Sequence, residues 1–327
     1  MTALRLIAMS KPWQTADIPS LTGKRVLITG ANSGIGYFAA LKLARKGAHV
    51  LLACRDRKRG DDALNRLQAD SPGTNAELVI LDLASLASVR SFAAGELALK
   101  RPLHLLINNA GVMAPPKRIE TADGFELQFA TNVLGHFALT GLLMPALERA
   151  AADSADPPRI VTIASIAHKG GKVHFDDLQS ARSYSPKGAY NQSKLANLML
   201  AFELDRRLPA AGSRILSIAA HPGVASTNIF QTGNYSSFER TIRNLAGHAI
   251  SILLNTDAEG ALPTLYAATS PDAISGGYYG PQGLMETRGH IVASAKVAPQ
   301  ALDQAAAARL WRVSEDLTGV RYLSQPI

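Results

Sequence analysis

Residues 24–54 constrain the fold of this chain more than any other stretch, because a strand, a glycine-rich turn, a helix and a second strand follow one another there. KRVLIT, residues 24–29, is a short apolar run rich in β-branched residues and predicts a buried strand. Glycines at 30, 34 and 36 precede the apolar-periodic helix of residues 37–47 and the strand AHVLLAC, 48–54. A βαβ unit of this kind predicts two parallel strands joined by a right-handed crossover.

The glycines between this first strand and its helix predict a phosphate-binding turn. The start of a helix carries unpaired N–H groups and positive dipole potential, both of which suit a pyrophosphate. Backbone can approach a ligand closely only where no Cβ intervenes, as at Gly30, Gly34 and Gly36. This placement therefore indicates a dinucleotide site, with an ordinary βα turn as the alternative.

The residues at the end of the second strand indicate whether NAD or NADP binds. Folds that bind NAD often place an acidic residue here to hold the adenosine ribose hydroxyls. This chain instead has Cys54, Arg55 and Asp56. The Arg55 guanidinium could form charge-assisted bonds to a 2′-phosphate, whereas Asp56 could serve NAD if the turn has another shape. We favour NADP.

Strands and helices alternate along the rest of the chain, which predicts an α/β domain. Residues 1–22 are expected to be an irregular lead-in, and residues 23–327 a single dinucleotide-binding and catalytic domain. The further expected strands are 76–82, 103–108, 159–165, 213–223 and 276–283. The further expected helices are 58–69, 86–99, 123–150, 188–208, 257–268 and 301–318.

Composition excludes several other classes of protein. The single cysteine, Cys54, rules out an intrachain disulfide and a cysteine-based metal site. No apolar run approaches the ~20 residues that span a bilayer, and the N-terminal apolar stretch is too short for a signal peptide, so we expect a cytoplasmic protein without a transmembrane segment. The net charge of +8 comes from scattered Lys and Arg with no basic helix, so nucleic-acid binding is not expected.

Histidines do not indicate a metal site or a hydrolase. His168, His174 and His221 form no pair at ligand spacing with another histidine or a carboxylate on an evident helix, and the chain has no G-x-S-x-G elbow. We therefore expect no bound metal.

Tyr190 and Lys194 lie four positions apart in the predicted helix 188–208. This spacing puts both side chains on one helix face, ~6 Å apart along the axis. An ammonium beside a phenol favours the phenolate, so the pKa of Tyr190 is expected to fall below its usual ~10. The alternative is a lysine stem that merely covers the ring. Asn132 is polar in an apolar helix, so it is either a satisfied core residue or a site residue.

Several motifs together resemble the short-chain dehydrogenase/reductase family. Residues 29–36 match its TGxxxGxG signature, 108–111 its NNAG element, 190–194 its YxxxK and 222–223 its PG motif. The resemblance covers about residues 21–285 in the correct order. LLACRD, ASIAHKGGKVHFDDL, AYNQSKLANL and LWRVSEDLTGV are similar to the retinol-dehydrogenase-like branch, in the form of its soluble bacterial-type members. Many relatives in that branch carry an N-terminal membrane segment that is not evident here.

The resemblance implies a Rossmann-type, doubly wound, seven-stranded parallel sheet in the order 3-2-1-4-5-6-7, with helices on both faces. It also implies a substrate lid at about 226–255 and a C-terminal helix at about 301–318. Homodimers or homotetramers are common in the family, whose subunits commonly pair through their two long helices. The cofactor-binding residues that it implies, together with those argued above, are Gly30, Asn32, Ser33, Gly34, Ile35, Gly36, Arg55, Asp82, Leu83, Asn109, Ala110, Gly111, Tyr190, Lys194, Pro222, Gly223, Val224 and Thr227.

The implied chemistry is hydride exchange between nicotinamide C4 and a carbonyl or alcohol carbon. Tyr190 would be the acid/base and Lys194 would bind the nicotinamide ribose. Ser165 would hold the substrate oxygen, and Asn132 would position Lys194 through water and help relay protons. The predicted function is NADP(H)-dependent, reversible reduction of a small apolar aldehyde or ketone. The alternatives are a double-bond reductase of the protochlorophyllide-reductase type and a non-catalytic NADP(H)-sensing binding protein.

Overall fold

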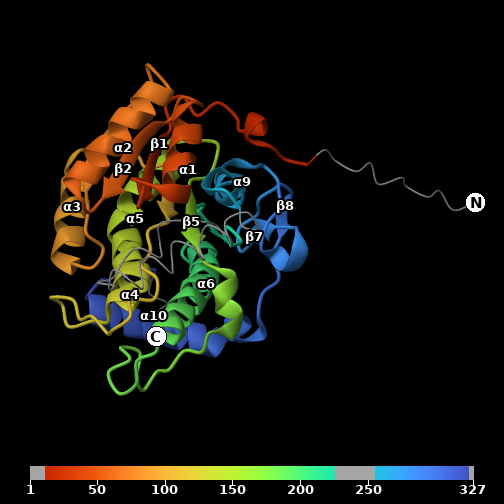
Figure 1. The fold of residues 1–327 in the computed structure, drawn as a ribbon. Helices are drawn as coiled ribbons and strands as arrows, with labels where there is room; N and C mark the ends of the chain where they lie inside the picture. The colour runs from red at the N-terminus through yellow and green to blue at the C-terminus, as the bar shows by residue number, and fades with distance from the viewer. Residues whose placement is uncertain (1–11, 225–254, 324–327) are drawn as a thin grey trace, which may run out of the picture.

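The computed structural model describes residues 12–224 and 255–323, and its described strands form one eight-stranded sheet (Figure 1). The strand order is β3-β2-β1-β4-β5-β6-β7-β8, and every neighbouring pair is parallel except β7 and β8. The strands are β1 (Arg25–Thr29), β2 (His49–Cys54), β3 (Ala76–Ile80), β4 (Leu105–Asn108), β5 (Arg159–Ile163), β6 (Leu216–Ala220), β7 (Tyr278–Pro281) and β8 (Val292–Ser294).

The predicted order of seven parallel strands is confirmed, and β8 is an addition that the sequence did not predict. Strand β8 runs antiparallel to β7, with Tyr279 opposite Ser294 and Pro281 opposite Val292. The connection between them is too short for the crossover helix that a parallel strand needs, so the chain turns back on itself. The turn uses Gly289, whose φ is 138°.

Helices cover both faces of the sheet, as predicted (Figure 1). One apolar core joins the sheet to α3, α5, α6 and α10, and the other joins the opposite face to α1, α2 and α9. The described helices are α1 (Gly34–Ala44), α2 (Arg57–Asp70), α3 (Leu86–Ala98), α4 (Leu127–Phe129), α5 (Gly135–Asp153), α6 (Pro186–Ala210), α8 (Asp257–Gly260), α9 (Leu262–Thr269) and α10 (Gln304–Thr318). Shorter turns are η1 (Thr15–Asp17), η2 (Ala130–Leu134), η3 (Ile166–Gly170), η5 (Leu284–Glu286) and η6 (Pro299–Leu302).

The long central helix runs from Leu127 to Asp153 through α4, the π-turn η2 and α5. It begins later than the predicted residue 123 because the Glu126 carboxylate accepts the Phe129 N–H at 2.7 Å and caps the first turn. Among the described residues this is the one helix long and apolar enough to cross a membrane, with a mean hydropathy of 1.3. Protein covers 89% of its most apolar window, as in the core helix of a folded domain.

Some sequence predictions fall where the structure gives no description. The predicted lid, about 226–255, lies outside the described residues up to 254, and Thr227 lies outside them as well. The first 11 residues of the predicted lead-in are likewise outside the described part of the chain.

Candidate active site

A cleft of about 420 Å³ lies at the carboxyl ends of the parallel strands. Its walls come from the turns after β1, β2, β3, β4, β5 and β6, and from the first turns of α6. Every predicted cofactor residue that the structure describes lines it: Gly30, Asn32, Ser33, Gly34, Ile35, Gly36, Arg55, Asp82, Leu83, Asn109, Ala110, Gly111, Tyr190, Lys194, Pro222, Gly223 and Val224. Ser165 also lines the cleft, whereas Asn132 lies behind the wall formed by its neighbour Thr131.

The turn between β1 and α1 has the shape that close backbone approach requires. Gly30 has a φ of 67°, and a Cβ there would lie 2.9 Å from the Cα of Ala110. A Cβ on Gly36 would collide with the carbonyl oxygen of Gly30. Ser33 is the N-cap residue of α1, and its side chain makes no capping hydrogen bond. The N–H groups at the start of this helix therefore remain open to the cleft. These residues fit a pyrophosphate.

Arg55 and Asp56, in the turn after β2, have different surroundings. The Asp56 carboxylate accepts the Arg59 N–H at 2.9 Å and thereby caps α2. Arg55 and Arg59 are exposed and line the same end of the cleft. The end where adenosine is expected is therefore lined by two arginines, Arg55 and Arg59, and by Asp56, one oxygen of which caps a helix.

Thr29 joins the glycine turn to the turn after β4. Its hydroxyl oxygen accepts the N–H groups of Asn109 at 2.9 Å and Ala110 at 3.0 Å. The Asn109 side-chain amide donates in return to the Thr29 carbonyl at 2.8 Å. Two turns that are 80 residues apart in sequence are thus held in one arrangement.

Tyr190 and Lys194 lie on one face of α6, as their spacing predicts. The Lys194 ammonium nitrogen lies 5.9 Å from the centroid of the Tyr190 ring and donates to the Ile163 carbonyl at 2.9 Å. Burial raises the pKa of Tyr190 to about 12, and a hydrogen bond with Ser165 lowers it only in part. Burial also lowers the pKa of Lys194 to about 8. The predicted lowering of the Tyr190 pKa is wrong for this structure, because desolvation by burial is the largest effect on the ring.

Asn132 is fully buried in the π-turn η2, and its side chain bonds to partners other than Lys194. Its amide donates to the Val112 carbonyl at 3.0 Å and to the Ser193 hydroxyl at 2.9 Å, and its oxygen accepts the Val112 N–H at 2.8 Å. A Cβ on Gly111 would lie 3.4 Å from the Asn132 oxygen and 3.7 Å from the Lys194 nitrogen. Asn132 therefore fixes the chain after β4 against α6, close to Lys194.

His136 is a residue of this site that the sequence reasoning missed. Its Nδ1 lies 3.0 Å from the Asn132 carbonyl oxygen and its Nε2 lies 2.8 Å from the Thr29 hydroxyl. Burial lowers the pKa of His136 to about 4, so the ring is neutral. Because a carbonyl oxygen only accepts, Nδ1 carries the proton and Nε2 accepts from Thr29. The available signal was a histidine four residues after Asn132 in an otherwise apolar helix.

Other polar residues near the cleft have structural partners. Tyr184, six residues before Tyr190, donates its hydroxyl to the Pro115 carbonyl at 2.7 Å. Cys54 is buried, and burial raises the pKa of its thiol to about 11. Within residues 12–224 and 255–323, no three His, Cys, Asp or Glu side chains are grouped to hold a metal ion.

Comparison with known proteins places this fold and cleft in a family. The model of the family described as short chain dehydrogenase matches residues 24–236. Mouse retinol dehydrogenase 14 is 40% identical over 310 residues, which cover 91% of this chain and 86% of that protein. Mouse polyprenol dehydrogenase is 40% identical over 304 residues, covering 92% and 86%.

Solved structures with a similar fold agree with this family assignment. The crystal structure of an uncharacterised protein from Mycobacterium paratuberculosis is similar with a TM-score of 0.76 and 40% identity, covering 95% of this chain and 99% of the other. The Pseudomonas aeruginosa RhlG/NADP active-site complex is similar with a TM-score of 0.60 and 28% identity, covering 79% and 94%.

The chain belongs to the short-chain dehydrogenase/reductase family. Within that family it is retinol-dehydrogenase-like, and it is an oxidoreductase that acts on CH–OH or C=O groups with a nicotinamide cofactor.

Proposed function

We propose that this protein is an NADP(H)-dependent reductase that converts apolar aldehydes or ketones to alcohols in a reversible reaction. The observation that carries the proposal is the single cleft that brings a pyrophosphate-binding turn, the Arg55 end and the group of Ser165, Tyr190 and Lys194 together. The bound nicotinamide supplies the hydride, and the residues of this chain supply orientation, charge and the proton.

Tyr190 is the proposed proton donor to the carbonyl oxygen. A pKa of about 12 keeps its phenol protonated at neutral pH, which is the form that reduction requires. The Ser165 hydroxyl, beside the phenol, would hold the substrate oxygen by a hydrogen bond. Lys194, with a pKa of about 8, is largely charged at neutral pH and would stabilise the phenolate as it develops. Asn132 would support this arrangement by fixing the chain between β4 and α6.

The preference for NADP over NAD is supported by the turn after β2. One oxygen of the Asp56 carboxylate accepts the Arg59 N–H, so this carboxylate already helps to cap α2. Arg55 is exposed and lines the cleft, and its planar guanidinium suits a 2′-phosphate in charge and in bidentate geometry.

An apolar substrate is supported by the relatives, whose names are retinol dehydrogenase and polyprenol dehydrogenase. Cytoplasmic location and assembly as a homodimer or homotetramer are further parts of the proposal. Cell fractionation and the solution mass of the purified protein test these two parts.

The test of the proposed reaction is the loss of NADPH absorbance in the presence of a panel of aldehydes and ketones of increasing chain length. We expect turnover that increases with the apolar length of the substrate. Tyr190→Phe should abolish turnover while the dissociation constant for NADPH stays close to that of the wild type. Tight NADPH binding by the wild type without turnover on any carbonyl would reject the enzymatic proposal in favour of a cofactor-sensing protein.

A further inference from the structure

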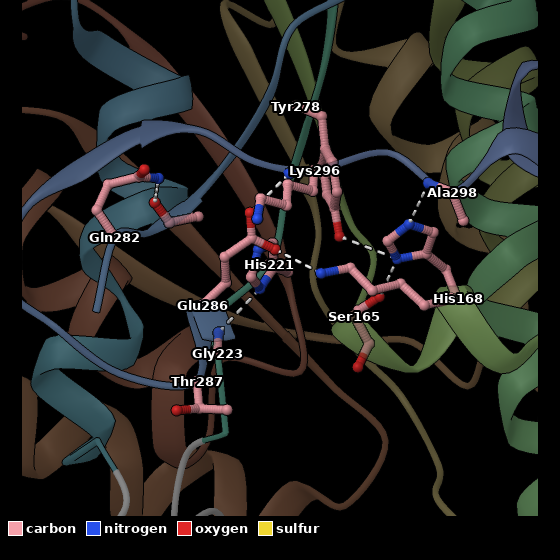
Figure 2. A network of polar contacts seen from close by, with 12 residues as sticks. Ser165, His168, His221, Gly223, Tyr278, Gln282, Glu286, Thr287, Lys296 and Ala298 are labelled. Carbon is pink, nitrogen blue, oxygen red and sulfur yellow. Dashed lines mark hydrogen bonds and ion pairs between the residues drawn. The ribbon is translucent and has the colours of Figure 1, made fainter. Parts of the chain in front are cut away.

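The turn that follows Ser165 is held by a segment far along the chain (Figure 2). This turn is η3, Ile166–Gly170, and the segment that holds it is residues 286–300, from the end of η5 into η6. The segment lies beyond the residues that the family model matches, 24–236. The contacts therefore join a turn within the matched residues to a segment beyond them.

His168 makes the central contact. Its side chain is fully buried, its Nδ1 lies 2.6 Å from the Ser165 carbonyl oxygen, and its Nε2 accepts the Ala298 N–H at 3.2 Å. A ring nitrogen that accepts an N–H carries no proton, and a ring nitrogen bonded to a carbonyl oxygen must carry one. The ring is therefore the neutral tautomer with its proton on Nδ1. Burial lowers the pKa of His168, in agreement with this neutral form.

An ion pair and an amide make further contacts with the same turn. The Lys169 ammonium lies 2.6 Å from Glu286, whose second carboxylate oxygen accepts the Lys296 N–H at 2.7 Å. Glu286 is 7% exposed and has a φ of 60°, a strained conformation for a residue with a Cβ. The Gln300 side-chain amide donates to the carbonyl of Lys169 at 3.0 Å. Three residues of the C-terminal segment, Glu286, Ala298 and Gln300, thus hold two residues of the turn, His168 and Lys169.

The surroundings of His168 leave its ring little freedom. The Tyr278 ring meets it edge-on, with 5.4 Å between centroids and 88° between planes, and the Tyr278 hydroxyl lies 3.4 Å from Nδ1. The other charged and titratable groups that face this region are Lys169, Glu286 and His221. Figure 2 shows the ring between the Ser165 backbone on one side and Ala298 on the other.

We propose that His168 is a positioning residue for Ser165, in which Nδ1–H holds the Ser165 carbonyl, and Ala298 of the C-terminal segment holds the ring. The Ser165 peptide plane sets the direction of the Ser165 side chain, which lies beside the Tyr190 hydroxyl. A shift of about 1 Å in a group that orients the reacting atoms can lower a rate about 100-fold. The inference rests on the proposed role of Ser165 in carbonyl reduction.

Two substitutions separate the two contacts of the ring. In His168→Asn the amide nitrogen takes the place of Nδ1 and keeps a donor for the Ser165 carbonyl. In His168→Gln the amide oxygen reaches toward the Nε2 position and keeps an acceptor for Ala298, but the donor to Ser165 is lost. We expect kcat for carbonyl reduction to fall about 100-fold in His168→Gln. In His168→Asn, which keeps the donor to Ser165, kcat should fall only about tenfold. The dissociation constant for NADPH should be unchanged in both.

The matched control is His174→Gln, which replaces an exposed histidine of the same loop. Melting temperatures show whether each variant is folded under the assay conditions. Should both His168 variants fail to fold, Ala298→Pro tests the same contact. It removes the N–H donor at a residue whose φ of −73° already suits proline, and it should lower kcat without changing NADPH binding.

Ser165→Ala distinguishes failure of the proposed role of Ser165 from failure of the positioning role of His168. Wild-type turnover in Ser165→Ala would reject the proposed role of Ser165 and this inference together. Loss of turnover in Ser165→Ala, with His168→Gln and Ala298→Pro still near wild type, would reject only the positioning role. Equal kcat in His168→Asn and His168→Gln would also reject it, since the donor to Ser165 would then make no difference.

Discussion

Acidification is expected to destabilise this fold through His136, and the size of the effect follows from the structure. Burial lowers the pKa of the His136 ring from 6.5 to about 4, and the nearby Lys194 charge acts in the same direction. Nε2 accepts from Thr29, so a second ring proton would face a hydroxyl that must then reorient. The folded state therefore binds this proton less tightly than the unfolded chain does.

The direction of the pH dependence is fixed by this difference. Well above about pH 6.5 the His136 ring is neutral in both the folded and the unfolded chain. The contribution of the neutral ring to the free energy of unfolding is then fully present. As the pH falls from about 6.5 toward 4, the unfolded chain takes up the proton first and the free energy of unfolding decreases. Each pKa unit corresponds to about 1.4 kcal/mol, so the loss from His136 alone is about 2 kcal/mol at about pH 5.

Urea unfolding at about pH 7.5 and about pH 5 measures this loss. The wild type should lose about 2 kcal/mol more than His136→Gln between the two conditions, because other groups that titrate, such as His221, are present in both proteins. His174→Gln, at an exposed histidine, controls for the substitution itself. Equal losses in the wild type and His136→Gln would refute the assignment of a neutral, buried His136.

Three further changes are expected to have distinct effects. Arg55→Ala should weaken NADPH binding far more than NADH binding, while the exposed Arg57→Ala, which does not line the cleft, should change neither; titration of both cofactors compares them. Gly36→Ala should weaken binding of both cofactors and destabilise the fold by about 1–3 kcal/mol in urea unfolding, because its Cβ would collide with Gly30. Trp311→Ala should destabilise by about 3–5 kcal/mol in the same measurement, since the side chain is 1% exposed.

Much of the fold could be predicted because its signals are local. The run from the first strand through Gly30, Gly34 and Gly36 is contiguous, and alternation of strands and helices with right-handed crossovers restricts the sheet order. Strand β8 escaped prediction because VAS, residues 292–294, is too short to show a period. Its pairing depends on the turn that brings it back to β7.

In the candidate site, too, local features could be predicted from the sequence, whereas features that depend on distant contacts could not. Tyr190 and Lys194 could be paired from helix spacing, because both belong to one helix. The direction of the Tyr190 pKa shift could not be predicted, since it depends on how much protein covers the ring. The contact of His168 with Ala298 joins residues 130 positions apart, and the sequence carries no signal for such a pair. Thr227 lies outside the described residues, so its predicted role stays a prediction.

Helix α10 has a consequence for self-association. Trp311 on this helix packs against Phe137 of α5, with 4.9 Å between ring centroids, and lies under the Arg207 guanidinium of α6. Tyr322, just after α10, fills the space that a side chain at Gly141 would need. The resemblance to the family led us to expect subunits that pair through their two long helices. Here Trp311 and Tyr322 of the chain's own C-terminal part pack on α5 and α6, the two long helices. A dimer that pairs through these two helices must therefore use the part of them that α10 leaves uncovered, or displace α10.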